Sequence, residues 1–343
     1  MKEELMFSMM VKFKVPVFVL LLVMALPTHA KTYKIATVSP DGLSWMKKMR
    51  DGVKEIKERS EGRVKIKIYP GGVQGDDNTV LRKIRIKQLH GGAVAASSLT
   101  RFYPDLQIYN LPLQFRTREE VDYVRDQMDQ SIIDGLAENG MVSFSLTENG
   151  FAYILSKEPI RGAEELKGVK VWVPSGDPVS AKLIQAFGVS PIPLPVTDVL
   201  AGLQTGLIDA LIVPPIVALA LQWHNHIGYV TNLPVVYIYS MLAMDKKAFE
   251  GMTLEDQALV KEVMDRVFDE VDRDNRIDNE KAYNALLTQG IKEVQPDLEK
   301  MGDWRAQAEA SIEALVDSGE ISQASLDLLR LHLETVREAA AAE

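Results

Sequence analysis

Two histidines one residue apart, His224 and His226, form the cluster in this sequence that most resembles a metal site. On a strand, a spacing of two would point both imidazoles to the same side, as a shared metal ion requires. The surrounding residues are neutral, however, and the protein has no cysteine that could add a thiolate ligand. We therefore expect two surface or loop histidines, with no bound metal and no cofactor.

A glycine-rich turn is the second candidate, because the backbone amides of Gly71, Gly72 and Gly75 could bind an anion. Asp76 and Asp77 follow directly, and their negative charge would repel a phosphate. The turn is better explained as the start of a helix capped by Asp76. The sequence also lacks the local signatures of serine hydrolases, nucleotide-binding enzymes and zinc proteases. These absences argue against an enzyme.

The composition is that of an ordinary globular protein. The chain has 343 residues, of which 46% are apolar and 25% charged, which favours about two domains. There are 39 basic and 48 acidic residues, so the formal net charge is −9. A negative protein repels nucleic acid, and we expect no nucleic-acid partner.

The first thirty residues have the pattern of a secretory signal. Lys12 and Lys14 precede an apolar run from Val15 to Ala25, and a small residue, Ala30, stands at the expected cleavage site. The run is too short to span a bilayer. We expect residues 1–30 to be a cleaved signal peptide. Because no cysteine is present to carry a lipid, the mature protein should be free in the periplasm.

After the signal, apolar strand patterns alternate with amphipathic helix patterns. Such alternation predicts an α/β fold with largely parallel sheets and covering helices. Thr253 with Asp256 resembles a capping box at the start of a long helix that runs towards Gly290. The expected strands are residues 32–38, 63–69, 93–96, 169–173, 190–194, 209–213 and 235–244.

Several short motifs follow one another in an order that resembles the DctP-type solute-binding proteins of tripartite ATP-independent periplasmic (TRAP) transporters. The similarity runs from about Lys34 to at least Phe249. The motifs are Tyr69-Pro70, Gln74-Gly75-Asp76-Asp77, Gly91-Gly92, Phe102-Tyr103-Pro104, Leu111-Pro112, Phe115-Arg116, Glu148-Asn149-Gly150-Phe151, Leu166-Lys167-Gly168-Val169-Lys170, Val173-Pro174 and Leu203-Gln204-Thr205-Gly206-Leu207-Ile208-Asp209.

This resemblance implies an α/β, two-lobed periplasmic binding protein fold (type II-like), with mixed sheets, crossing hinge strands and a long connecting helix. Residues 31–149 with about 239–280 would form the first lobe. Residues 150–238 with about 281–343 would form the second lobe and its helical tail. The resemblance further implies that the lobes close on a small organic ligand and deliver it to membrane permease subunits driven by an ion gradient. We expect the binding protein to be a monomer.

Three positions depart from the family pattern, in which two arginines and an asparagine bind the ligand carboxylate. Trp172 stands at the first arginine position, Ala152 at the second, and Val213 at the asparagine position. An indole or a methyl group cannot replace the bidentate fork of a guanidinium, and a desolvated carboxylate without its partner costs about 3–5 kcal/mol. A small dicarboxylate is therefore disfavoured. An apolar, aromatic or long-chain ligand fits better.

The candidate ligand-binding residues follow from these matches and from the neighbouring motifs. Trp172 could instead be plain core, and Tyr237 and Tyr239 could pack in the hinge. Arg101 and Arg116 could still supply a partner for a carboxylate, or could form structural ion pairs. The candidates are Trp172, Ala152, Val213, Phe151, Asp77, Ser97, Val196 and Tyr237.

Three other functions remain open at this point. The protein could bind an ordinary small carboxylate through a different arginine. It could also be a ligand sensor that docks on a receptor domain, or a periplasmic enzyme. A solute-binding subunit of a TRAP-type importer is the hypothesis that the sequence favours most.

Overall fold

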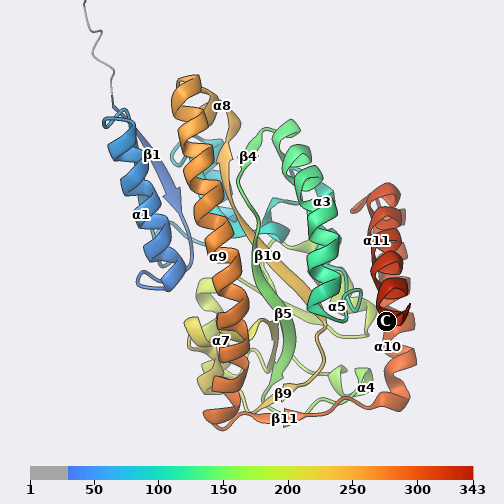
Figure 1. Ribbon diagram of the computed structural model, residues 1–343. Coiled ribbons are helices and arrows are strands. Elements are labelled where there is room, and N and C mark those ends of the chain that lie inside the picture. Colours follow the sequence, from blue (N-terminus) through green and yellow to red (C-terminus); the bar gives the residue numbers. More distant parts are fainter. Residues whose placement is uncertain (1–29, 343) are drawn as a thin grey trace, which may run out of the picture.

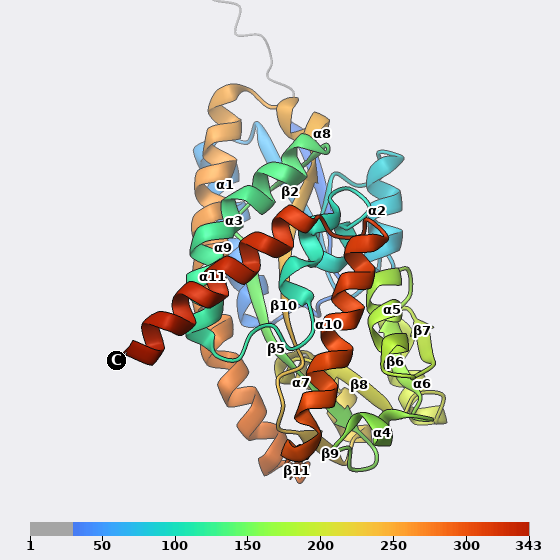
Figure 2. The ribbon, with the colours of Figure 1, turned by 90° about the vertical axis from the view of Figure 1, so that its right-hand side faces the viewer.

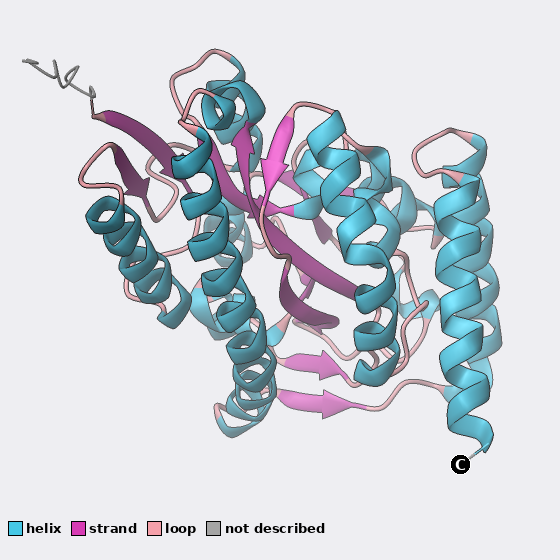
Figure 3. Ribbon diagram, turned by 45° about the horizontal axis from the view of Figure 1, so that its top comes forward, coloured by secondary structure: helices cyan, strands magenta, loops and turns pink. Residues whose placement is uncertain are grey.

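The computed structural model describes residues 30–342 and shows helices around a central set of strands (Figures 1 and 3). The expected signal segment, residues 1–30, lies outside the described residues except for Ala30. The α-helices are α1 (Ser44–Arg59), α2 (Asp77–Arg85), α3 (Arg118–Glu138), α4 (Ala163–Leu166), α5 (Pro178–Ala186), α6 (Val199–Thr205), α7 (Pro215–Ala220), α8 (Lys246–Glu250), α9 (Leu254–Thr288), α10 (Met301–Asp317) and α11 (Gln323–Ala342).

The strands form one mixed arrangement with the order β2-β1-β3-β10-β5-β8-β6-β7. Strands β1, β2 and β3 are parallel, as are β6, β7 and β8, while β10 and β5 run antiparallel to their neighbours. The strands are β1 (Lys31–Ala36), β2 (Val64–Tyr69), β3 (Gly91–Ala95), β4 (Met141–Ser143), β5 (Thr147–Ser156), β6 (Val171–Pro174), β7 (Pro191–Leu194), β8 (Ala210–Val213), β9 (Tyr229–Thr231), β10 (Val236–Asp245) and β11 (Lys292–Val294).

Two strands and one helix connect the lobes. The first half of β5 pairs with β10, and its second half pairs with β8 and β9 of the second lobe. The 35-residue helix α9 runs alongside both lobes (Figure 1). Its first half packs on α1, and its later residue Leu286 lies in the core of the second lobe. The predicted fold class, with crossing strands and a long connecting helix, is confirmed.

Side-chain caps fix where several helices begin. Thr253 accepts a hydrogen bond from the backbone N–H of Asp256 at 3.1 Å, as the capping pattern predicts. Asp76 accepts from the N–H of Thr79 at 2.9 Å, which confirms the predicted cap of α2. Such caps satisfy backbone N–H groups that have no partner within the helix.

Helix α9 holds the crossing strand β5 at a bulge. Gly150 has φ +94°, and a Cβ atom there would lie 2.6 Å from the side-chain nitrogen of Asn279. Asn279 donates to the carbonyl of Asn149 at 2.7 Å, and Asn275, one turn earlier, donates to that of Glu148 at 2.8 Å. Glycine is therefore required where the strand bends beneath the helix.

The C-terminal helices contact both lobes. Helix α10 packs on α5 of the second lobe, with the rings of Trp304 and Phe187 6.0 Å apart. Helix α11 lies across α3 of the first lobe (Figure 2). The sequence predicts that the whole C-terminal tail, about residues 281–343, belongs to the second lobe. The residue boundaries of the two lobes stay a prediction.

The histidine pair does not have the geometry that a strand would give. His224 and His226 lie in a short 3-10 helix, η4 (Trp223–His226), so the spacing of two does not place both imidazoles on one side. In residues 30–342 no three metal-ligating side chains are grouped closely enough to hold an ion. The helices of this same region are too short or too polar to cross a membrane.

Candidate ligand-binding site

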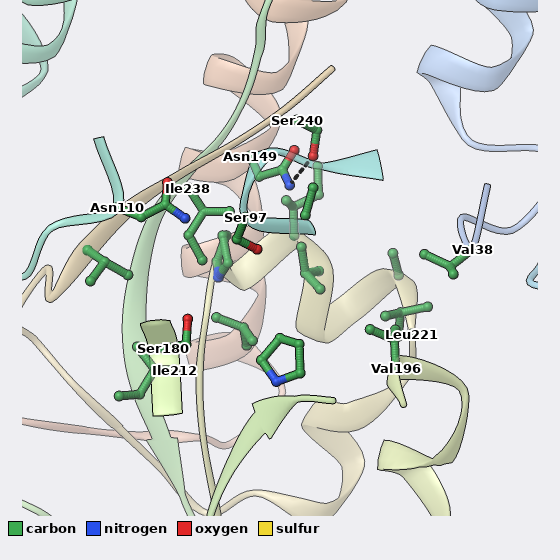
Figure 4. Close-up of a pocket in the computed structure, with 18 of the residues that line it drawn as sticks. Val38, Ser97, Asn110, Asn149, Ser180, Val196, Ile212, Leu221, Ile238 and Ser240 are labelled. Atoms are coloured by element: carbon green, nitrogen blue, oxygen red, sulfur yellow. Dashed lines mark hydrogen bonds between the residues drawn. The ribbon is translucent and has the colours of Figure 1, made fainter. Parts of the chain in front are cut away.

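A cavity of about 600 Å³ lies between the two lobes (Figure 4). Its lining residues follow the carboxyl ends of strands in both lobes, where ligands of open α/β sheets usually bind. The first lobe contributes 37–40, 76–78 and 93–98, and the second contributes 171–175 and 212–214. The size is that of a site for a drug-sized organic molecule.

The wall formed by the second lobe is largely apolar, apart from Ser175, Asp177 and Ser180. Trp172 is 7% exposed, its indole N–H donates to the carbonyl of Leu194 at 3.0 Å, and its ring lies 5.4 Å from that of Trp223. Trp172 is therefore part of both the core and the cavity wall. The two interpretations of this residue, as plain core and as a cavity-lining side chain, do not exclude each other. The other apolar lining residues of this lobe include Val196, Ile212, Val213, Ile216, Val217, Leu219 and Leu221.

The wall formed by the first lobe and the hinge carries most of the polar side chains. Asn149 donates to the hydroxyl of Ser240 at 2.8 Å (Figure 4). One carboxylate oxygen of Asp77 accepts from the N–H of Ala95 at 3.0 Å and from the hydroxyl of Ser98 at 3.1 Å. Burial raises the pKa of Asp77 to about 6, since desolvation outweighs these two hydrogen bonds.

Five of the candidate residues line the cavity and three do not. Trp172, Val213, Val196, Asp77 and Ser97 are lining residues. Whether each of the five contacts a ligand stays a prediction.

The other three candidates lie in the crossing strands. Ala152 is two residues before Ile154, which lines the cavity, but its own methyl group is not part of the wall. The ring of Phe151 packs against that of Tyr237, with centroids 5.7 Å apart. The hydroxyl of Tyr237 donates to Glu148 at 3.2 Å and accepts from Arg125 at 3.2 Å, which is hinge packing.

Neither alternative arginine reaches the cavity wall. The guanidinium of Arg101 lies over the ring of Phe102 at 5.1 Å, and Arg116 is exposed. Within residues 30–342, the only basic side chain on the wall is Lys281, whose Nζ is 3.7 Å from Asp278.

The cavity is also lined by polar residues that the sequence did not predict, among them Asp177, Asn110, Asn149, Ser180 and Ser240. A usable signal existed for Asp177, because it closely follows the predicted strand 169–173. The end of a parallel strand is where a ligand site is expected. Asn110 has no such signal, since the short helix η2 (Pro104–Asn110) has no clear pattern.

The turn between β6 and α5 connects the lobes across the cavity rim. The hydroxyl of Ser175 donates to Asp76 at 3.4 Å, and the side chain of Asn78 donates to the carbonyl of Ser175. Next to it, Gln107 of the first lobe donates to the carboxylate of Asp177 at 3.5 Å. These contacts join the lobes in a closed arrangement.

Comparison with protein families gives one match over most of the chain. The family described as bacterial extracellular solute-binding protein, family 7 (DctP), matches residues 35–318. The 2,3-diketo-L-gulonate-binding periplasmic protein YiaO of Escherichia coli is 24% identical over 208 residues, which are 60% of this chain and 63% of that protein. The C4-dicarboxylate-binding periplasmic protein DctP of Rhodobacter capsulatus is 22% identical over 245 residues, 70% of this chain and 72% of that protein.

Solved structures share the fold over nearly their whole length. The sugar acid binding protein of Advenella mimigardefordensis, in complex with galactonate, has a TM-score of 0.81 at 18% identity, covering 89% of this chain and 98% of that one. A TRAP periplasmic solute binding protein of Pseudomonas putida, with bound D-glucuronate, has a TM-score of 0.76 at 23% identity, covering 84% and 95%.

Proposed function

This chain belongs to family 7 of the bacterial extracellular solute-binding proteins, the DctP-type subunits of TRAP transporters, and we propose that it captures an organic solute with a large apolar part. It is a solute-binding transport protein and not an enzyme. In this proposal the two lobes close on the solute in the periplasm. The closed protein then delivers the solute to the membrane permease subunits.

The observation that carries the ligand class is the absence of an arginine on the cavity wall within residues 30–342. Trp172 takes the position of the expected arginine and presents part of an indole ring to the cavity. Contact between an aromatic ring and an apolar ligand is favourable. The ring cannot, however, form the hydrogen bonds or the ion pair that would compensate a carboxylate for the loss of its hydration. The apolar side chains of the second lobe extend this surface around the cavity.

The location and the oligomeric state are part of the same proposal. Residues 1–30 have a signal-peptide pattern, and the relatives described above are named as periplasmic proteins. Both walls of the cavity come from a single chain, which supports a protein that works as a monomer.

A second candidate ligand is a small acid, which the names of the relatives favour. Galactonate, D-glucuronate and C4-dicarboxylates are the compounds that those names print. In this protein an acid would have to use Lys281, the basic side chain on the described wall, in competition with Asp278. An exposed lysine is a poor substitute for a guanidinium held in a cleft.

The test is to identify what the protein carries. The mature chain, residues 31–343, is purified from its natural host and denatured, and the released compounds are identified by mass spectrometry. We expect a largely apolar compound at about one per chain. Recovery of a sugar acid or a dicarboxylate, together with saturable stabilisation of the stripped protein by that acid, would contradict the apolar class. It would leave the transport function intact.

A further inference from the structure

Acidic side chains outnumber basic ones on the cavity wall. Asp76, Asp77 and Asp177 line the cavity, and none of the three forms an ion pair with a basic side chain in the part of the chain that the structure describes. Asp278 also lines it and lies beside Lys281. The wall therefore has three carboxylates without a cationic partner. Such a surface repels an anionic ligand and attracts a cationic one.

Several polar side chains of the wall already donate hydrogen bonds to acceptors inside the protein. The indole N–H of Trp304 is a buried donor without a partner among the described residues, so the wall keeps at least one free neutral donor. Six other lining side chains already donate to acceptors within the protein, namely Asn78, Ser98, Asn149, Trp172, Ser180 and Asn275.

Two acceptors on the same wall, by contrast, are buried and unused. One oxygen of Asp77 accepts two hydrogen bonds, while the other, Oδ1, has no partner and the residue is 9% exposed. The Oδ1 atom of Asn110 is also buried without a partner. In Figure 4 the side-chain nitrogen of Asn110, and not Oδ1, lies on the side of Ser97. Buried acceptors of this kind cost free energy until a donor reaches them.

We propose that the ligand carries an ammonium group, which binds at the carboxylate of Asp77, on an apolar body that packs against Trp172. This proposal rests on the proposed function and names the head group of its ligand. An ammonium offers up to three N–H donors and supplies a positive charge to Asp77, which has no cationic partner among the described residues. The apolar part of the second-lobe wall receives the rest of the molecule, so both walls of the cavity are used.

The test uses three compounds with one hydrocarbon body and different head groups: 4-phenylbutylamine, 4-phenylbutanol and 4-phenylbutyrate. Each is titrated against ligand-stripped mature protein, and binding is followed by calorimetry. Because a hydrogen bond to a charged group is worth more than a neutral one, we expect the amine to bind about 10- to 100-fold more tightly than the alcohol. The acid should bind most weakly of the three.

Two variants separate the carboxylate from general charge effects. Asp77→Asn keeps an acceptor for Ala95 and Ser98, so the fold should be retained, and it should remove most of the preference for the amine over the alcohol. Asp126→Asn, on the exposed side of α3, makes the same change in net charge away from the cavity and should leave the preference unaltered.

Three results would count against these ideas, in different ways. If the acid binds as tightly as the amine, the head-group proposal is wrong and the apolar-ligand proposal stands. The same holds if Asp77→Asn leaves the amine preference unchanged. If none of the three compounds binds saturably, the apolar cavity itself is not the ligand site that we propose.

Discussion

The indole rings of Trp172 and Trp223 lie edge to face in the second lobe, with centroids 5.4 Å apart and planes at 67°. Both rings border the cavity, and so do Trp45 and Trp304. All four tryptophans of the protein therefore lie where a ligand could change their surroundings. Tryptophan emission should report ligand binding without any added label.

Replacement of Trp172 tests whether this residue contributes to ligand affinity as well as to the stability of the core. Trp172→Ala removes a buried ring and should lower the free energy of unfolding by about 3–5 kcal/mol. It should also weaken binding of an apolar ligand about tenfold or more, because the ligand loses an aromatic surface. Trp172→Phe should recover part of both losses. Chemical unfolding and ligand titration, done on the same samples, measure the two effects.

Leu211 supplies the matched control for this prediction. It belongs to the same hydrophobic cluster as Trp172 and is fully buried, but it does not line the cavity. Leu211→Ala should therefore destabilise the protein by about 2–5 kcal/mol and leave the affinity of the folded protein unchanged. If Trp172→Ala behaves in the same way as Leu211→Ala, Trp172 is core alone.

Local patterns predicted much of the fold, because they depend on neighbours in the sequence. The caps at Asp76 and Thr253 are examples, since each joins residues three apart. The bulge at Gly150 could not be predicted in the same way. It depends on Asn279, which is more than a hundred residues away, and on a register shift between β5 and β10.

In the candidate site, too, features set by neighbouring residues could be predicted, whereas features set by distant residues could not. Period two separates Phe151 from Ala152 on opposite faces of β5, but it does not say which face borders a cavity. Ile154 reaches the wall from the face of Ala152, whereas Phe151 packs against Tyr237 in the hinge. The unpaired carboxylates could not be predicted either, because the lack of a cation near Asp77 or Asp177 among residues 30–342 depends on how distant segments come together in the fold.

A buried arginine should be essential for the stability of the hinge. Arg125 of α3 lies 3.0 Å from Asp129 and 2.9 Å from Asp272 of α9, and it donates to the carbonyl of Leu146 at 3.1 Å. Arg125→Ala leaves two carboxylates without their partner, and we expect a loss of about 3–5 kcal/mol in the free energy of unfolding. Arg273→Ala, an exposed arginine on α9, should cost less than about 0.5 kcal/mol. Equal losses in urea unfolding would refute the prediction.

The contact between Asn78 and Ser175 should favour the closed form. Asn78→Ala removes a hydrogen bond that joins the lobes only when they are closed. Such a bond contributes about 0.5–1.5 kcal/mol, so ligand affinity should fall about 2- to 10-fold. Asn139→Ala, at the exposed end of α3, should not change the affinity.

Closure of the lobes can also be measured directly. Small-angle X-ray scattering should show that ligand reduces the radius of gyration of the wild type. A radius of gyration that does not change on confirmed binding would argue against closure.

Asp77 should also make stability depend on pH. Burial raises the pKa of its carboxyl from 3.8 to about 6; the charge of Asp76 adds to this, and hydrogen bonds from Ala95 and Ser98 oppose it. In the unfolded chain the group titrates near its ordinary value of about 3.9. Between about pH 4 and 6 the folded protein therefore holds more protons than the unfolded chain. Through this group, the free energy of unfolding falls as the pH rises through that window.

Asp77→Asn removes this pH dependence, since the amide does not ionise. The variant should be more stable than the wild type at pH 7, by up to about 3 kcal/mol for a shift of about two pKa units, and the difference should vanish near pH 4. Urea unfolding at a series of pH values measures it, and a constant difference across the series would show that Asp77 is not the group responsible. A gain in stability with a loss of amine binding would mean that this carboxylate is kept for the ligand, because the fold alone is better without its charge.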